Sequence, residues 1–232
     1  ELLIFISRSV SPFHSVEAGV QLLKQNAFQE LLPDTVWKLK KNGKYFVRVY
    51  GSSLMAFVIG KNPRAELHIV SAHTDFPCLR VKPAAAVQAN GYGKLNVELY
   101  GGMIRSTWMD RPLSLAGKVV LQWKNAFHPE VRLMDLSRPV MTIPSLAIHM
   151  NRKVNEGVEL NPQKDMLPLL TMTEDEEGQA DFFSALLAEE LSCAKEEILS
   201  YELTVYPAEQ GCLLGSRQEF ISSPRIDNLT SV

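Results

Sequence analysis

Cysteine is scarce in this sequence, and the cysteines that occur lie far apart. Cys78, Cys193 and Cys212 form no C-x-x-C pair. An odd, widely spaced set is poor material for a disulfide framework and is typical of proteins that stay in a reducing compartment. We therefore expect a cytoplasmic protein.

Long hydrophobic runs and an excess of one charge are also lacking. No apolar run approaches the roughly 20 residues of a membrane span, and the opening "ELLIFIS" is too short and too acidic for a signal peptide. The net charge of −2 provides no basic field for nucleic acid or an anionic membrane. The sequence therefore predicts neither a nucleic-acid partner nor a membrane partner.

The hydrophobic residues that are present follow the periods of helices and strands. With 232 residues, of which 46% are hydrophobic, the chain can form one large domain or two modest ones. Ser11 and Pro12 predict the start of an amphipathic helix, because serine caps helices and proline suits the first turn. Strands are expected at 44–50, 54–60 and 66–72. The last two runs are largely apolar, as in an α/β sheet buried on both faces.

The pattern changes from about Ala84. Short strand-like runs separated by glycine, proline and polar turns indicate a β-rich segment rather than βαβ units. We expect strands at 94–100, 117–123, 131–136 and 138–150. A helix is expected over 180–192, followed by a short helix capped by Ser192 that leads into a strand ending at Tyr206.

The residues with the clearest chemical potential follow the run at 66–72. His73 and Asp75 stand two residues apart where the expected strand ends, and α/β proteins place their sites beyond the carboxyl ends of strands. A metal-binding imidazole commonly donates its second ring N–H to a carboxylate. A hydrogen-bonded polar turn has the same sequence pattern, so the spacing alone leaves both interpretations open.

Two further residues are ambiguous by themselves. Asp227 follows an expected strand end, where an aspartate can cap a helix or bridge two metal ions. His149 ends the apolar run 138–150 and suits either a binding role or a buried interface.

Four long motifs in one order connect these residues. "SAHTDFPCLRVKP", "YGGMIRSTWMDRPLSLAGKV", "IPSLAIHMNRKVNEG" and "SSPRIDNLTSV" together resemble the aspartyl aminopeptidases, which are intracellular co-catalytic zinc exopeptidases. The "SPFH" turn at the start of the first expected helix fits this family as well, so the resemblance covers the whole sequence. Met103 and Pro112 depart from the family's usual pattern, which affects local loop geometry rather than the zinc chemistry.

The resemblance implies a role for each site residue. His73 would bind one zinc ion, Asp75 would act in catalysis by orienting His73, and Asp227 would bridge two zinc ions. His149 would bind substrate in the active site of a neighbouring subunit. The implied reaction is removal of an N-terminal Asp or Glu from a peptide by a metal-activated water, with two zinc ions per active site.

The resemblance also implies a domain organisation. Residues 1–84 and 207–232 would belong to an α/β zinc-peptidase domain with a central mixed sheet, interrupted by a β-rich dimerisation domain at 85–206. Dimers would assemble further into a dodecamer. Trp108, Asp110 and Arg111 would then serve in packing and at interfaces rather than in catalysis.

The general base and the remaining metal ligands of the family lie beyond the "RIDN" motif, whereas this sequence ends at Val232. We therefore expect these 232 residues to be part of a longer protein and to be inactive by themselves. One alternative is a non-catalytic oligomerisation or binding protein. A two-metal phosphoester hydrolase is a weaker alternative, because such enzymes commonly open with aspartate before histidine, the reverse of the order here.

Overall fold

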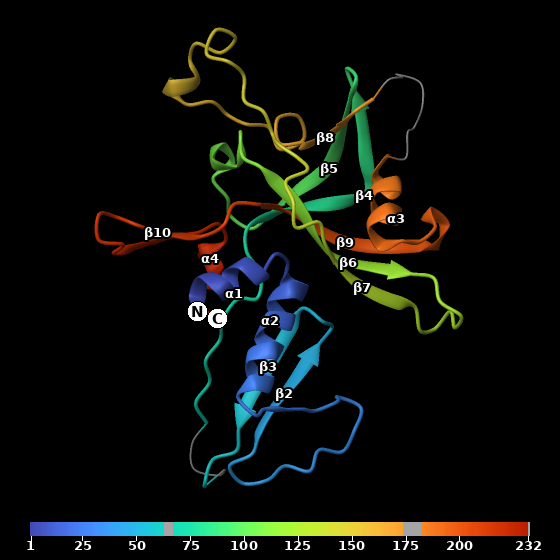
Figure 1. The fold of residues 1–232 in the computed structure, drawn as a ribbon, viewed down its shortest axis with the longest axis vertical. Coiled ribbons are helices and arrows are strands. Elements are labelled where there is room, and N and C mark those ends of the chain that lie inside the picture. The colour runs from blue at the N-terminus through green and yellow to red at the C-terminus, as the bar shows by residue number, and fades with distance from the viewer. Residues whose placement is uncertain (63–66, 174–181, 232) are drawn as a thin grey trace. The chain divides into compact units, whose positions relative to one another are not determined.

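The computed structural model describes residues 1–62, 67–173 and 182–231 and divides the chain into two compact units. The first unit comprises Glu1–Phe76 and Gln210–Val232, and the second comprises Pro77–Glu209 (Figure 1). The expected insert at 85–206 falls within the second unit. Each unit is described by itself below.

Two helices open the first unit. The short helix α1 (Leu2–Arg8) was not expected from the sequence, whereas α2 (Pro12–Gln25) confirms the predicted helix. The Ser11 side chain caps α2 by accepting a hydrogen bond from the backbone N–H of His14. His14 Nδ1 lies 2.8 Å from the same Ser11 oxygen, so this histidine belongs to the capping turn.

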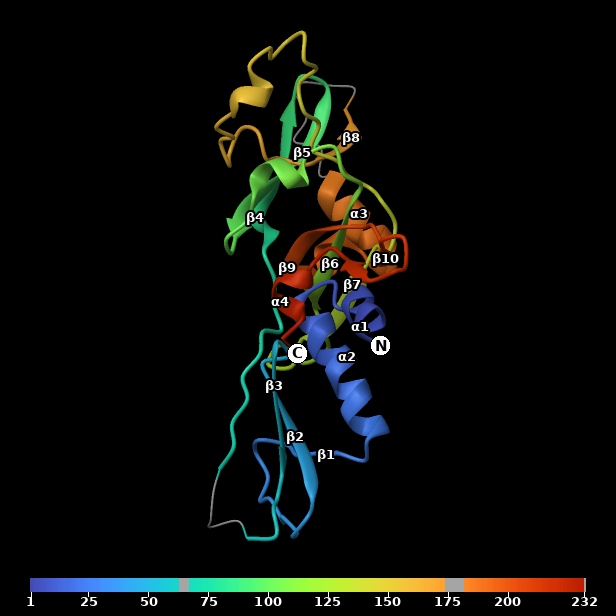
Figure 2. The ribbon, with the colours of Figure 1, turned by 90° about the vertical axis from the view of Figure 1, so that its left-hand side faces the viewer.

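A small mixed sheet packs against α2. Strand β1 (Gln29–Glu30) runs parallel to β2 (Lys44–Val49), and β2 pairs antiparallel with β3 (Ser53–Val58). Val16 and Val20 of α2 form a buried cluster with Phe46 of β2, and both views of the ribbon show α2 lying along this sheet (Figures 1 and 2). The strands predicted at 44–50 and 54–60 are thereby confirmed, but β3 is largely exposed rather than buried on both faces.

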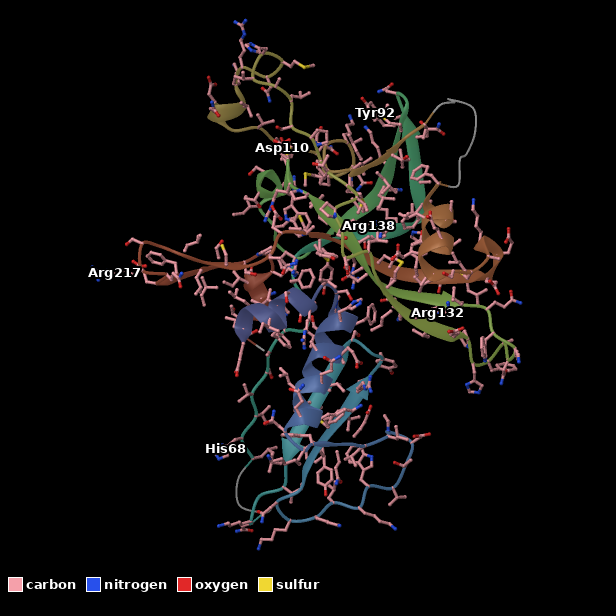
Figure 3. All side chains as sticks on the ribbon, in the orientation of Figure 1. His68, Tyr92, Asp110, Arg132, Arg138 and Arg217 are labelled. Atoms are coloured by element: carbon pink, nitrogen blue, oxygen red, sulfur yellow. The ribbon has the colours of Figure 1, made fainter. Side chains whose placement is uncertain are left out.

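The strand predicted at 66–72 is wrong over the part that the structure describes, and Glu66 lies outside the described residues. Leu67–Ala72 form no strand, and the side chains of Leu67, Ile69 and Val70 are 83%, 76% and 91% exposed. A strand needs a neighbour for its backbone N–H and C=O groups, and no described strand pairs with this segment. His68, labelled in Figure 3, lies on this extended trace.

The second unit is built on an antiparallel sheet of six strands in the order β7-β6-β9-β4-β5-β8. The expected strands near 94–100, 117–123 and 131–136 are confirmed, while β4 and β8 were not predicted. The strands are β4 (Cys78–Ala89), β5 (Tyr92–Tyr100), β6 (Leu113–Leu121), β7 (Glu130–Asp135), β8 (Leu169–Met172) and β9 (Ile198–Pro207).

A helix covers part of this sheet. The predicted helix corresponds to α3 (Phe182–Leu191), with residues 180–181 of the prediction outside the described residues. Phe183 is buried and its ring meets Tyr201 of β9 edge-on, with the centroids 5.4 Å apart. The cap predicted at Ser192 is wrong. The following turn, η3 (Lys195–Glu197), starts after Ala194, whose N–H donates to the Glu197 carboxylate at 2.7 Å.

The strand predicted at 138–150 is also wrong. Only isolated bridges occur there, at Met141 and Thr142, and 144–150 are exposed. Met141 and Ile143 are buried, but the apolar side chains after them stay exposed, so no burial holds 144–150 as a strand.

The remaining elements are short. In the second unit they are η1 (Arg105–Trp108) and η2 (Val154–Glu156). In the first unit the chain forms a hairpin of β10 (Cys212–Leu214) and β11 (Phe220–Ser222), and then α4 (Ile226–Leu229). Among the described helices, none is long and apolar enough to cross a membrane. Cys78, Cys193 and Cys212 all lie in the described part of the chain and form no disulfide.

Candidate metal centre

His73 and Asp75 interact directly in the first unit. Nδ1 of His73 lies 2.8 Å from Oδ1 of Asp75, while the histidine side chain is 60% exposed and the aspartate side chain 27% exposed. The carboxylate therefore fixes the ring and leaves Nε2 as the ring nitrogen for a metal ion, which is the arrangement expected of a metal-binding histidine. The spacing in the sequence made a contact between these two side chains possible but left open whether it serves a metal or a polar turn.

Backbone contacts hold the His73–Asp75 turn in place. The hydroxyl of Thr74 donates to the Ser52 carbonyl at 2.8 Å, and the His73 N–H donates to Ser231 Oγ at 3.4 Å. Ser231 in turn donates to the Asn228 carbonyl at 2.8 Å. The turn is thereby connected both to the residue before β3 and to the segment that follows Asp227.

Asp227 lies within α4 and is exposed. It does not cap this helix, since the N-cap position is held by Arg225, which has a left-handed φ of 62°. Arg225 donates to the Ile6 carbonyl at 3.3 Å and its guanidinium lies 5.8 Å from the Phe76 ring centroid. These contacts fasten the Asp227 segment to α1 and to the residue after Asp75.

The donor set suits zinc in chemistry but is incomplete in number. Imidazole nitrogen and carboxylate oxygen are both common zinc ligands, and His73 and Asp227 present them on segments joined by the Ser231 contact. No group of three or more His, Cys, Asp or Glu side chains able to hold a metal occurs among the described residues. His73 and Asp227 are therefore two potential donors, and a metal centre that used them would need further donors.

The fourth predicted site residue, His149, belongs to the second unit. It lies in an exposed turn, where the Met150 N–H donates to the Ala147 carbonyl at 2.8 Å. The expected strand end at this position is absent, so a turn rather than a sheet presents the imidazole.

Sequence reasoning missed the residues that support the site. Thr74 holds the turn through its hydrogen bond to Ser52. Its position between His73 and Asp75 was the one sign in the sequence that it could support the site. Nothing in the sequence indicates that Ser231 contacts His73, because that contact spans most of the chain.

Comparison with known proteins places this chain in a class of metal-dependent peptidases. Residues 5–232 match the family model "Aminopeptidase I zinc metalloprotease (M18)". A "Probable M18 family aminopeptidase 2" of Clostridium acetobutylicum is 44% identical over 235 residues, which cover 100% of this chain and 54% of the relative. The corresponding protein of Ectopseudomonas mendocina is 40% identical, covering 99% of this chain and 54% of its own.

Solved structures agree with this assignment. A structure of "the Ape4 and Nbr1 complex" matches with a TM-score of 0.91 and 34% identity, over 98% of this chain and 47% of that one. An S. cerevisiae mApe1 dodecamer shares the fold with a TM-score of 0.80 at 24% identity, over 97% of this chain and 51% of that one.

The chain belongs to the M18 family of zinc metallopeptidases, whose matched relatives are named aminopeptidases. It spans about half the length of the curated relatives that it matches. The predicted family and the predicted α/β class with a mixed sheet are thus confirmed.

Proposed function

We propose that this chain supplies one half of the active site of a zinc aminopeptidase that removes N-terminal Asp or Glu from peptides. The observation that carries the proposal is the His73–Asp75 pair, in which a partly buried carboxylate orients an exposed imidazole at 2.8 Å. Membership of the M18 family supports the aminopeptidase activity. The acidic specificity rests on the motifs that resemble aspartyl aminopeptidases.

We propose His73 and Asp227 as zinc ligands, in a centre of two zinc ions. Zinc bound there would polarise the scissile carbonyl and lower the pKa of a bound water. Asp75 would hold the His73 ring in one orientation and one tautomer, with Nε2 facing the metal. The Thr74–Ser52 and His73–Ser231 hydrogen bonds would keep the ligand segment from moving when substrate binds.

Two functions of the proposed enzyme require groups beyond those named. Hydrolysis needs a base for the proton of the attacking water, and recognition of an acidic side chain needs a cationic or donor-rich pocket. Because the described residues hold no group of three possible metal ligands, we expect the 232-residue chain to be inactive by itself. We propose that a longer polypeptide supplies the missing donors.

We further propose that His149 binds substrate in the active site of a neighbouring copy, within homo-oligomers built from dimers and reaching a dodecamer. Its position in an exposed turn beside Ile148 and Met150, which are 46% and 74% exposed, supports a role between copies. The mApe1 relative forms a dodecamer, which also supports the proposal. That the described cysteines form no disulfide supports a cytoplasmic location.

The decisive experiment compares two polypeptides, the 232 residues alone and the longer polypeptide of the same gene, with intact mass establishing which is present. Each is incubated with zinc and with matched peptides that begin with Asp, Glu, Leu or Lys. We expect chelator-sensitive release of Asp and Glu by the longer polypeptide only. Equal release of Leu would contradict the acidic specificity, and turnover by the 232 residues would contradict the dependence on further donors.

A second experiment tests the role of Asp75. Asp75→Asn replaces the carboxylate by a carboxamide, which keeps an oxygen that can accept the hydrogen bond from His73 but loses the negative charge that favours the metal-bound imidazole. The zinc affinity of the longer polypeptide should therefore fall by about 10- to 100-fold. Competition with a chromogenic chelator measures the affinity. Asp34→Asn, at an exposed position of the first unit, is the control and should leave it unchanged. Unchanged affinity in Asp75→Asn would show that the pair is only a polar turn.

A further inference from the structure

One short segment of the second unit contacts both ends of an exposed loop. The segment is 104–111, which contains η1 and the motif "IRSTWMDR". The loop is 146–159, which carries His149 and η2. Trp108 is buried and roots the segment in the unit, with only 6% of its surface exposed.

Asp110 fastens the beginning of the loop (Asp110 is labelled in Figure 3). Its Oδ1 accepts the Ser145 backbone N–H at 2.9 Å, and its Oδ2 accepts the Ser145 hydroxyl. The Asp110 N–H donates to the Ile143 carbonyl at 2.9 Å. The hydrogen bonds from the Ser145 hydroxyl and backbone also lower the pKa of the Asp110 carboxyl, so it is ionised and accepts both bonds near neutral pH.

Arg105 fastens the other end. Its Nη1 donates to the Leu160 carbonyl at 2.6 Å. A hydrogen bond from a charged donor is stronger than one between neutral groups. The carbonyl is held by a side chain from the same segment that holds Ser145.

The loop between these two points has little else to fix it. Its backbone hydrogen bonds are local, such as Val154 N–H to the Asn151 carbonyl at 3.1 Å. Its apolar side chains are exposed rather than packed, with Met150 74% and Val158 44% exposed. A loop with few buried contacts takes its conformation mainly from its anchored ends.

We infer that Arg105 and Asp110 are positioning residues, which clamp the two ends of loop 146–159 and thereby fix where His149 is presented. Arg111 shares the segment but serves a different contact, a bidentate ion pair with Glu209 at 2.9 and 3.1 Å. The consequence for catalysis rests on the proposed role of His149 as a substrate-binding residue. The clamp itself rests only on the hydrogen bonds of Arg105 and Asp110.

Hydrogen exchange of the 232-residue chain tests the clamp directly. Asp110→Asn removes the charge while asparagine tolerates the left-handed φ of 57° at this position, and Arg105→Ala removes the second anchor. Each should speed exchange of the loop amides by about tenfold. Ser145→Ala, which removes only the hydroxyl bond, should give a smaller increase and guards against a folding defect in the other variants.

Matched controls exist in the same unit. Asp135 also accepts the N–H and the hydroxyl of a nearby serine, Ser137, at 3.0 and 2.7 Å. Arg132 also donates to a carbonyl, that of Leu191, at 2.9 Å. Asp135→Asn and Arg132→Ala should leave exchange in loop 146–159 unchanged. An unchanged loop in Asp110→Asn and Arg105→Ala, or an equal effect of the controls, would overturn the clamp.

Kinetics of the assembled longer polypeptide test the link to His149. We expect Asp110→Asn and Arg105→Ala to raise KM for acidic peptides about tenfold with kcat little changed, because a displaced substrate-binding residue weakens binding. Asp110→Glu should restore part of the affinity. Faster loop exchange with an unchanged KM would overturn the positioning role in catalysis. The clamp would then stand, and the proposed substrate-binding role of His149 would be wrong.

Discussion

Gly117 illustrates how a single residue limits the second unit. It lies within β6 opposite Leu203 of β9, with a φ of 153°. A Cβ at this position would overlap the Glu202 carbonyl oxygen and approach Leu203 Cα to 2.9 Å. Both atoms belong to backbone of the central β9 strand, so neither can move aside without disturbing the sheet.

We therefore predict that Gly117→Ala destabilises the second unit by about 2–4 kcal/mol. Urea denaturation followed by far-UV circular dichroism measures the change. Gly102→Ala is the control, because a Cβ there would meet nothing within 4 Å. A loss below about 0.5 kcal/mol for Gly117→Ala, the range of ordinary surface changes, would mean that β6 and β9 separate easily.

At this same scale the sequence predicted the contact between His73 and Asp75 but not the residues that support it. His73 and Asp75 are two residues apart, so their contact is local and its type follows from known ligand chemistry. The tie from His73 to Ser231 depends on how distant segments meet, which no local pattern encodes. Asp227 was singled out only through the family motif, since a lone aspartate after a strand equally suits a cap, and its role as a metal ligand stays a prediction.

At the scale of elements, an ion-pair network connects α2 with β1 and β2. Arg48 donates to both oxygens of Glu30 at 2.7 and 3.2 Å and to Glu17 at 2.9 Å. The hydrogen bond from Arg48 is the largest cause that lowers the pKa of Glu30 below its usual value of 4.5. Because the folded pKa is depressed, this contribution to stability is complete above the usual carboxyl pKa and is lost as pH falls through the lowered one.

Arg48→Met, which keeps the alkyl stem but removes the charge, should cost about 1 kcal/mol at neutral pH, since the side chains involved are partly exposed. The difference from the native chain should shrink when urea denaturation is repeated at about pH 3. Lys40→Met, at an exposed position of the first unit, should show no such pH-dependent difference. A pH-independent cost for Arg48→Met would assign it to packing instead.

Elements with local signals were predictable and elements that need partners were not. Ser11 and Pro12 define the start of α2 by themselves. The apolar runs at 66–72 and 138–150 have strand-like composition, but composition does not supply the neighbouring strand that a ladder requires. Leu67, Ile69 and Val70 are accordingly exposed, as are Leu146 and Ile148.

At the scale of the whole molecule, the second unit has its own core and sheet. Its chain enters through β4 and leaves through β9, and these strands are paired, with Leu79 opposite Val205. Pro77 and Glu209, the ends of the unit, therefore lie beyond the same end of one strand pair. Arg111 ties Glu209 to this region through its bidentate ion pair.

A polypeptide of residues 77–209 should consequently fold alone, because all six described strands of its sheet lie within these residues. Circular dichroism and a cooperative thermal transition would confirm this. In the complementary polypeptide, a short glycine-serine linker joins Phe76 to Gln210 and residues 77–209 are absent. It should lack the thermal transition that the 77–209 polypeptide shows. A disordered 77–209 polypeptide would mean that the unit depends on the rest of the chain.

The pairing of β4 with β9 also determines how the second unit responds to a mechanical load. A pull between Pro77 and Glu209 acts at the open end of two antiparallel neighbours, so their backbone hydrogen bonds break one after another rather than all at once. The same sheet pulled along β6 and β9 from opposite ends would load its bonds together in shear. The unit should therefore unfold at a low force when it is pulled between Pro77 and Glu209, where the rest of the chain is attached. It should resist a higher force when it is pulled along β6 and β9 from opposite ends.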